Sequence, residues 1–201
     1  SVSVSSGSSK ISSSGEVMVL TGNAGDTGSS GSLFMFSGSA INGNSGAFEI
    51  KTGESAVGRS GSIYFAVGKS GSNGRSGGSV VFRAGDSASE KGGDILMISG
   101  RGVSKSSGNI FVQTGNVGGA GNSGSISLDT GTSVGGSSGA FVISTGKANG
   151  VSGNILISVG DSNGASGGNV ILKGGYSLDN TGGGISLTSG GSKNSKSNGA
   201  R

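Results

Sequence analysis

One eight-residue phrase returns about every fifteen residues along the chain. Residues 139–146 give its pattern: a Gly opens it, large apolar residues follow two and four positions later, a Thr stands seventh and a Gly closes it. A truncated phrase at residues 1–7 precedes twelve full ones, so the chain is predicted to be an array of one structural unit. The opening glycines are Gly15, Gly31, Gly46, Gly61, Gly78, Gly93, Gly108, Gly124, Gly139, Gly153, Gly168 and Gly183.

Each phrase predicts a β-strand. The positions two and four residues after the opening Gly are apolar in all twelve full phrases, as in Val17 and Val19 or Phe141 and Ile143. A spacing of two residues places side chains on the same face of a strand, and the β-branched residues frequent at these positions suit a pleated surface. One face of each predicted strand is therefore apolar.

The seven or eight residues between phrases, called linkers below, predict a turn, a short weak strand and a second turn. They are rich in Gly, Ser, Asn and Asp, and pairs such as Asn149-Gly150 and Asn163-Gly164 are typical of turns. One small apolar residue near the middle of the linker is expected to face the phrase across a thin core. These mid-linker residues are Ile41, Ala56, Ala88, Val103, Val134 and Leu178.

The combined pattern predicts an all-β fold, a β-solenoid with about 15 residues per coil, about 13 coils and a thin two-sided core. A coil spacing of about 4.8 Å gives a rod of roughly 60 Å. A flat antiparallel meander is the alternative, and it is less favoured because its strands need not share one phase. We expect a single repeat array over residues 1–190 and a polar C-terminal tail or linker over residues 191–201.

Composition by itself points to a flexible chain. Gly accounts for 47 of the 201 residues, apolar residues for 30% and aromatic residues for 4%, which is poor for a packed core. Disordered chains, however, lack β-branched residues at a fixed phase. We therefore gave the periodicity more weight than the composition.

A second apolar row lies three residues after the opening Gly, on the face of the predicted strand that points away from the core. Strands that are apolar on both faces are usually covered on both faces, and a continuous exposed row of this kind marks an interface. We expect this outward ladder to pack laterally against another copy of the chain. Its members are Met18, Phe34, Tyr64, Val81, Leu96, Phe111, Val142, Leu156 and Ile171.

The sequence offers little for catalysis, for a cofactor or for a metal. It has no His and no Cys, so the two G-x-S-x-G matches at residues 74–78 and 164–168 lack the His that a serine nucleophile needs. Paired carboxylates could cleave a glycosidic bond, but the acidic residues share no repeat position beyond a loose one at Glu54, Asp86 and Asp161. We predict that the protein is not an enzyme and that it holds no cofactor and no metal.

Charge gives only weak indications of a partner. The net charge is +4 and the basic residues are spread along the chain without interleaved aromatic residues, so no nucleic-acid partner is expected. Arg59, Arg75, Lys91 and Lys105 stand just before successive phrases and could form a short ladder for an anionic polysaccharide. Ice binding is a further alternative, but no repeated outward Thr-x-Thr row is present.

The repeat resembles that of Gly- and Ser-rich short-coil β-solenoid proteins of extracellular fibres and adhesins. The resemblance covers nearly the whole chain and implies an extracellular or cell-surface structural role, with self-assembly into a filament through coil stacking and lateral packing. The alternative function is a surface-binding solenoid for ice or polysaccharide. No apolar run is long enough to span a membrane, and the start inside a repeat indicates a mature product or a fragment of a longer array.

Overall fold

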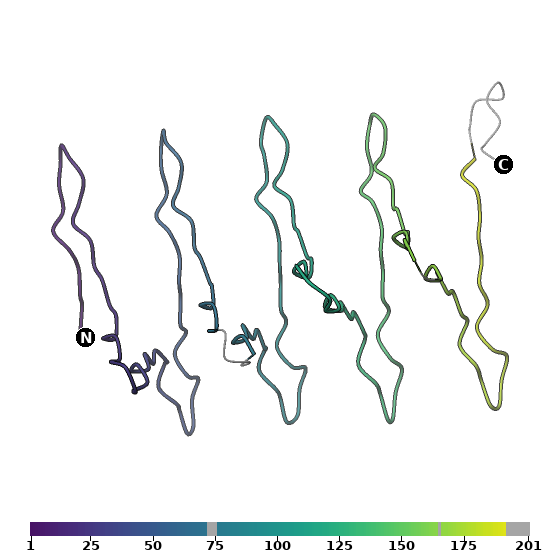
Figure 1. Cartoon of the computed structure of the whole chain (residues 1–201), viewed down its shortest axis with the longest axis horizontal. Helices are drawn as coiled ribbons and strands as arrows, with labels where there is room; N and C mark the ends of the chain where they lie inside the picture. Colours follow the sequence, from purple (N-terminus) through teal and green to yellow (C-terminus); the bar gives the residue numbers. More distant parts are fainter. Residues whose placement is uncertain (72–75, 165, 192–201) are drawn as a thin grey trace. The chain divides into compact units, whose positions relative to one another are not determined.

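The prediction of an all-β solenoid is wrong for the part of the chain that the structure describes. The computed structural model describes residues 1–71, 76–164 and 166–191, and within these ranges it contains no helix and no β-strand. Figure 1 shows extended stretches that alternate with narrow loops in which the chain turns back. The alternative of an antiparallel meander fails for the same reason, because it also requires strands.

The missing strands have a direct cause in the hydrogen bonding. A solenoid needs a ladder of backbone bonds between successive coils. Over the described ranges, the backbone–backbone bonds run from Gly15 N to Gly7 O at 3.2 Å, from Gly93 N to Gly85 O at 2.9 Å and from Gly183 N to Gly175 O at 2.9 Å. Each bond closes the base of one linker. None runs along a phrase, so neighbouring phrases are not paired.

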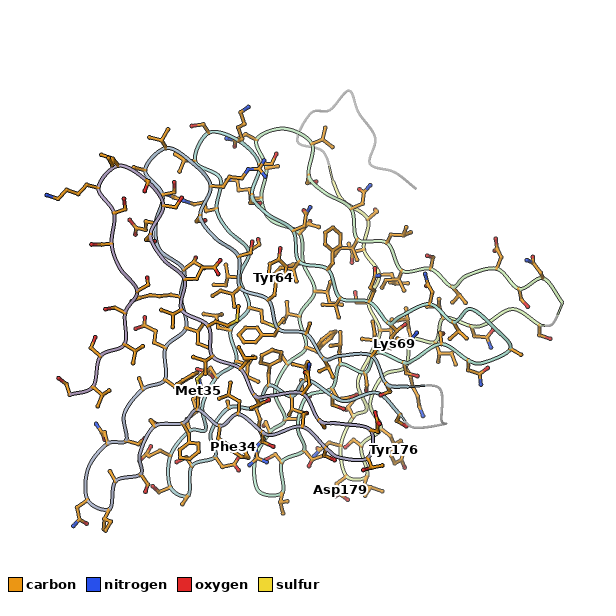
Figure 2. All side chains as sticks on the ribbon, turned by 60° about the vertical axis from the view of Figure 1, so that its left-hand side comes forward. Phe34, Met35, Tyr64, Lys69, Tyr176 and Asp179 are labelled. Atoms are coloured by element: carbon orange, nitrogen blue, oxygen red, sulfur yellow. The ribbon has the colours of Figure 1, made fainter. Side chains whose placement is uncertain are left out.

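The predicted two-sided core is also absent from the described residues, since none of their hydrophobic side chains is buried. The chain exposes 20459 Å², whereas a folded monomer of its mass, 19.0 kDa, exposes about 8,400 Å² and an extended chain about 27,500 Å². The exposed area of the single chain is therefore closer to that of an extended polypeptide than to that of a packed domain. Figure 2 agrees, because its side chains stand off the ribbon without an enclosed cluster.

The mid-linker residues were expected to face the core, and this expectation is also wrong. They lie at or beside the sharpest bends of the chain, with Ile41, Val103, Val134 and Leu178 almost fully exposed. The linkers are therefore loops without a second strand. The bends fall at residues 10–12, 26–27, 41–43, 56–58, 88–90, 103–105, 118–121, 134–136, 149–150, 163–164 and 178–180.

The fifteen-residue period nevertheless governs the local structure, because these bends recur with the repeat. Five of them are closed in the same way, by a Ser that stands six residues before the opening Gly. The Oγ of this Ser accepts a hydrogen bond from the backbone N–H of the residue three positions after the Ser, at 2.9–3.0 Å. Ser side chains commonly stabilise turns by such bonds. The capping residues are Ser9, Ser55, Ser87, Ser133 and Ser177.

Several opening glycines are held against the preceding phrase. A methyl group placed on Gly61 would lie 3.4 Å from Thr52 Cγ2, and one placed on Gly78 would lie 2.8 Å from Val67 Cγ1. The contacted residue stands six positions after the opening Gly of the preceding phrase, so the close approach brings the two ends of a linker together. The absence of a Cβ permits this approach.

The chain divides into two units, Ser1–Ser106 and Ser107–Arg201, and repeats of the same kind make up both. The expected polar tail, residues 191–201, lies outside the described residues except for Gly191.

Candidate self-association surface

The nine residues of the predicted outward ladder are highly exposed. Each of the nine side chains is 75–87% exposed, whereas the apolar residue directly before it in the phrase is 45–58% exposed. The period-two pattern therefore appears in the structure as a difference in exposure between alternate residues. Among the described residues, no hydrogen bond or ring contact joins any two of the nine.

The ladder is distributed over both units. Met18, Phe34, Tyr64, Val81 and Leu96 belong to the first unit, and Figure 2 labels Phe34 and Tyr64. Phe111, Val142, Leu156 and Ile171 belong to the second. Their role as a lateral interface stays a prediction, which the arrangement of a single chain does not test.

One aromatic contact in the first unit joins two successive phrases. The rings of Phe65 and Phe82 meet edge to face, with centroids 6.4 Å apart and an interplanar angle of 84°. This geometry is favoured because the positive edge of one ring meets the negative face of the other. Both residues stand four positions after their opening Gly, so the contact joins equivalent positions of neighbouring phrases.

An apolar groove lies beside this ring pair. Phe82 forms one wall, Ile95, Leu96 and Met97 form the other, and the volume between them is about 320 Å³. The groove therefore includes Leu96, one of the nine residues of the outward ladder. Sequence reasoning predicted the exposure of Leu96 but not the groove, because a groove depends on how two phrases approach each other.

The loop between the two walls, residues 83–94, is closed by several polar contacts. Arg83 Nη2 lies 2.9 Å from Asp86 Oδ2 near its start, and Lys91 Nζ lies 2.8 Å from Asp94 Oδ1 near its end. The backbone bond from Gly93 to Gly85 joins the two ends of this loop, and the Ser87 cap lies between the two ion pairs in the sequence. The ion pairs are exposed and contribute little energy individually, but together the contacts fix the ends of the loop.

The scattered charged residues do not form a second site. Glu49 pairs with Lys51 at 3.0 Å, and Lys91 of the suggested basic ladder pairs with Asp94. Arg75 lies outside the described residues, as does part of each G-x-S-x-G match. Across the described ranges, no group of acidic side chains is arranged to hold a metal ion.

Within the same ranges, no helix is both long enough and apolar enough to cross a membrane. No family model, characterised protein or solved structure matches the chain. The candidate surface is therefore defined by its own geometry: an exposed apolar ladder with one groove beside it.

Proposed function

We propose that this chain is a non-catalytic structural protein that works by associating with further copies of itself into an extracellular filament. The observation that carries the proposal is the exposed surface. A single copy exposes about 12,000 Å² more than a packed protein of its mass. Much of this surface belongs to large apolar side chains at regular positions, and covering such side chains is the main driving force for association.

The amount of exposed surface favours an assembly of many copies over a dimer. A specific interface of standard size buries about 1,600 Å² in total, which is a small part of the excess. A repeated apolar ladder along both units offers contact at many equivalent positions, so one partner leaves most of it uncovered. This reasoning supports an extended assembly in which each chain has several neighbours.

The outward ladder is the proposed lateral contact. Each of its side chains is more exposed than the apolar residue directly before it, and in the sequence the ladder is interrupted only at Glu49, Ser127 and Ser186. Covering the ladder removes apolar area from water, and this gain must exceed the conformational entropy lost when the chain is ordered. Coil stacking of a solenoid is not part of this mechanism.

The test is the assembly state of the purified chain over a wide range of concentration. Sedimentation velocity is expected to show growth from monomer to large species above a critical concentration, and electron micrographs of the same samples are expected to show filaments. Circular dichroism recorded across the transition reports whether ordering accompanies assembly. A chain that stays monomeric at every concentration refutes the proposal.

A further inference from the structure

We infer that the groove between residues 82 and 97 is an acceptor site for an outward aromatic side chain of a second copy, and that the residue it receives is Phe111. The inference rests on the proposed self-association and names the contact that extends the assembly from chain to chain. It joins two observations: a formed apolar groove in one unit and an unpartnered phenyl ring in the other.

The groove has the size and chemistry to take a phenyl ring. An apolar cavity of about 150 Å³ is enough to bind benzene, and the groove encloses about 320 Å³ between Phe82 and the Ile95–Met97 wall. Its lining consists of an aromatic ring, two aliphatic side chains and a thioether, with no charged group. Aromatic rings and Met sulfur both make favourable contacts with an inserted aromatic ring.

The two walls of the groove approach each other within a single chain. Phe65 contacts Phe82 edge to face, and the backbone bond from Gly93 to Gly85 joins the two ends of the linker between the walls. A site that is already formed loses less conformational entropy on binding than a flexible one. Of the nine ladder residues, Leu96 is the one that lines this groove.

Phe111 is the donor that fits best. It is the most exposed of the seven phenylalanines, at 84%, and it belongs to the outward ladder. Phe111 lies in the second unit, whereas the groove lies in the first, so the donor and the acceptor are different surfaces. A contact between different surfaces of identical chains does not close on itself in general and adds copies end to end.

Matched pairs of variants test the inference. Leu96→Ser removes part of a groove wall, and Leu156→Ser removes a Leu from the same repeat position outside this groove; the two residues are 80% and 85% exposed. Phe111→Ser removes the donor, and Phe34→Ser is its control at the same repeat position. We expect the first member of each pair to raise the critical concentration about tenfold more than its control, which corresponds to about 1.4 kcal/mol.

A mixing experiment then separates donor from acceptor. The Leu96→Ser chain keeps Phe111, and the Phe111→Ser chain keeps the groove, so an equimolar mixture is expected to form one-to-one pairs that neither variant forms alone. Sedimentation velocity measures these pairs. If both members of each matched pair weaken assembly equally, or the mixture forms no pairs, the groove assignment is wrong while self-association stands. A wild-type chain that never assembles refutes both.

Discussion

Replacing Val142 by Ser measures how much one rung of the outward ladder contributes to assembly. Full burial of a Val side chain stabilises by about 1.5–3 kcal/mol, and 78% of Val142 is exposed in the single chain. Covering Val142 with a neighbouring chain therefore contributes roughly 1–2 kcal/mol to the free energy of association. This figure allows for the part of the side chain that is already covered and for incomplete burial in the assembly. Since 1.4 kcal/mol is a factor of ten, the critical concentration is expected to rise by roughly 5- to 30-fold.

The reverse change provides the control. Ser127 occupies the same outward position in the preceding phrase, so Ser127→Val fills an existing gap in the ladder and is expected to lower the critical concentration by a similar factor. Sedimentation of both variants beside the wild type measures the pair. If both variants assemble like the wild type, the outward ladder is not the lateral contact and the area argument fails for it.

Three further predictions concern the linkers and the driving force. Gly78→Ala is expected to push the two ends of its linker apart, because the new methyl group would lie 2.8 Å from Val67 Cγ1. Gly139→Ala is the control, because its methyl group has no neighbouring atom within 4 Å. Amide hydrogen exchange in the linker before the substituted Gly should rise in the first variant only. Ser55→Ala removes the cap on the Gly58 N–H, so exchange at Gly58 is expected to rise roughly two- to tenfold, as for a bond of about 0.5–1.5 kcal/mol, and unchanged exchange would show that the cap contributes nothing. Assembly is expected to strengthen in sulfate and to weaken on cooling, as hydrophobic association does. It is expected to persist in high NaCl, because the ion pairs are 70–86% exposed and contribute little. Light scattering measures all three responses, and dissolution by NaCl would indicate electrostatic assembly instead.

The sequence predicted the local features better than the fold. Period-two spacing matches a difference in exposure, with Phe141 58% and Val142 78% exposed, because the direction of a side chain depends on the local backbone. The bends at Asn149-Gly150 and Asn163-Gly164 also follow from local residue preferences. In each case the information lies within a few residues of the position concerned.

The strands and the core could not be predicted in this way, because they require distant segments to pair. Ordering each residue costs about 1–2 kcal/mol, and the linkers are long, flexible and rich in Gly. The half-covered side chains of one chain offset little of that cost. Ile41 and Val103 illustrate the error: an apolar residue in the middle of a linker resembles a core residue in sequence, yet it lies at a bend in the structure.

The candidate groove was missed for a related reason. Phe82, Leu96 and Met97 occupy ordinary positions of two neighbouring phrases, and nothing in the repeat pattern distinguishes them from their counterparts elsewhere. The signal that could have pointed to them is the cluster of opposite charges in the linker between them, with Arg83 and Asp86 at one end. The capping serines had a clearer signal, since each stands at one fixed place in its repeat.

Three linkers are closed by a backbone bond over a short stretch of chain, and this has a consequence for how the protein could change in length. Loops of about ten residues close within about 10–100 ns, and the bond from Gly93 to Gly85 needs nothing from outside its own linker. A repeat whose contacts stay within its own linker can therefore be added or deleted without disturbing its neighbours. Each addition supplies one more weak attachment point on the same molecule, and the strength of attachment rises steeply with the number of such points. The number of repeats would thus set the valence of the chain.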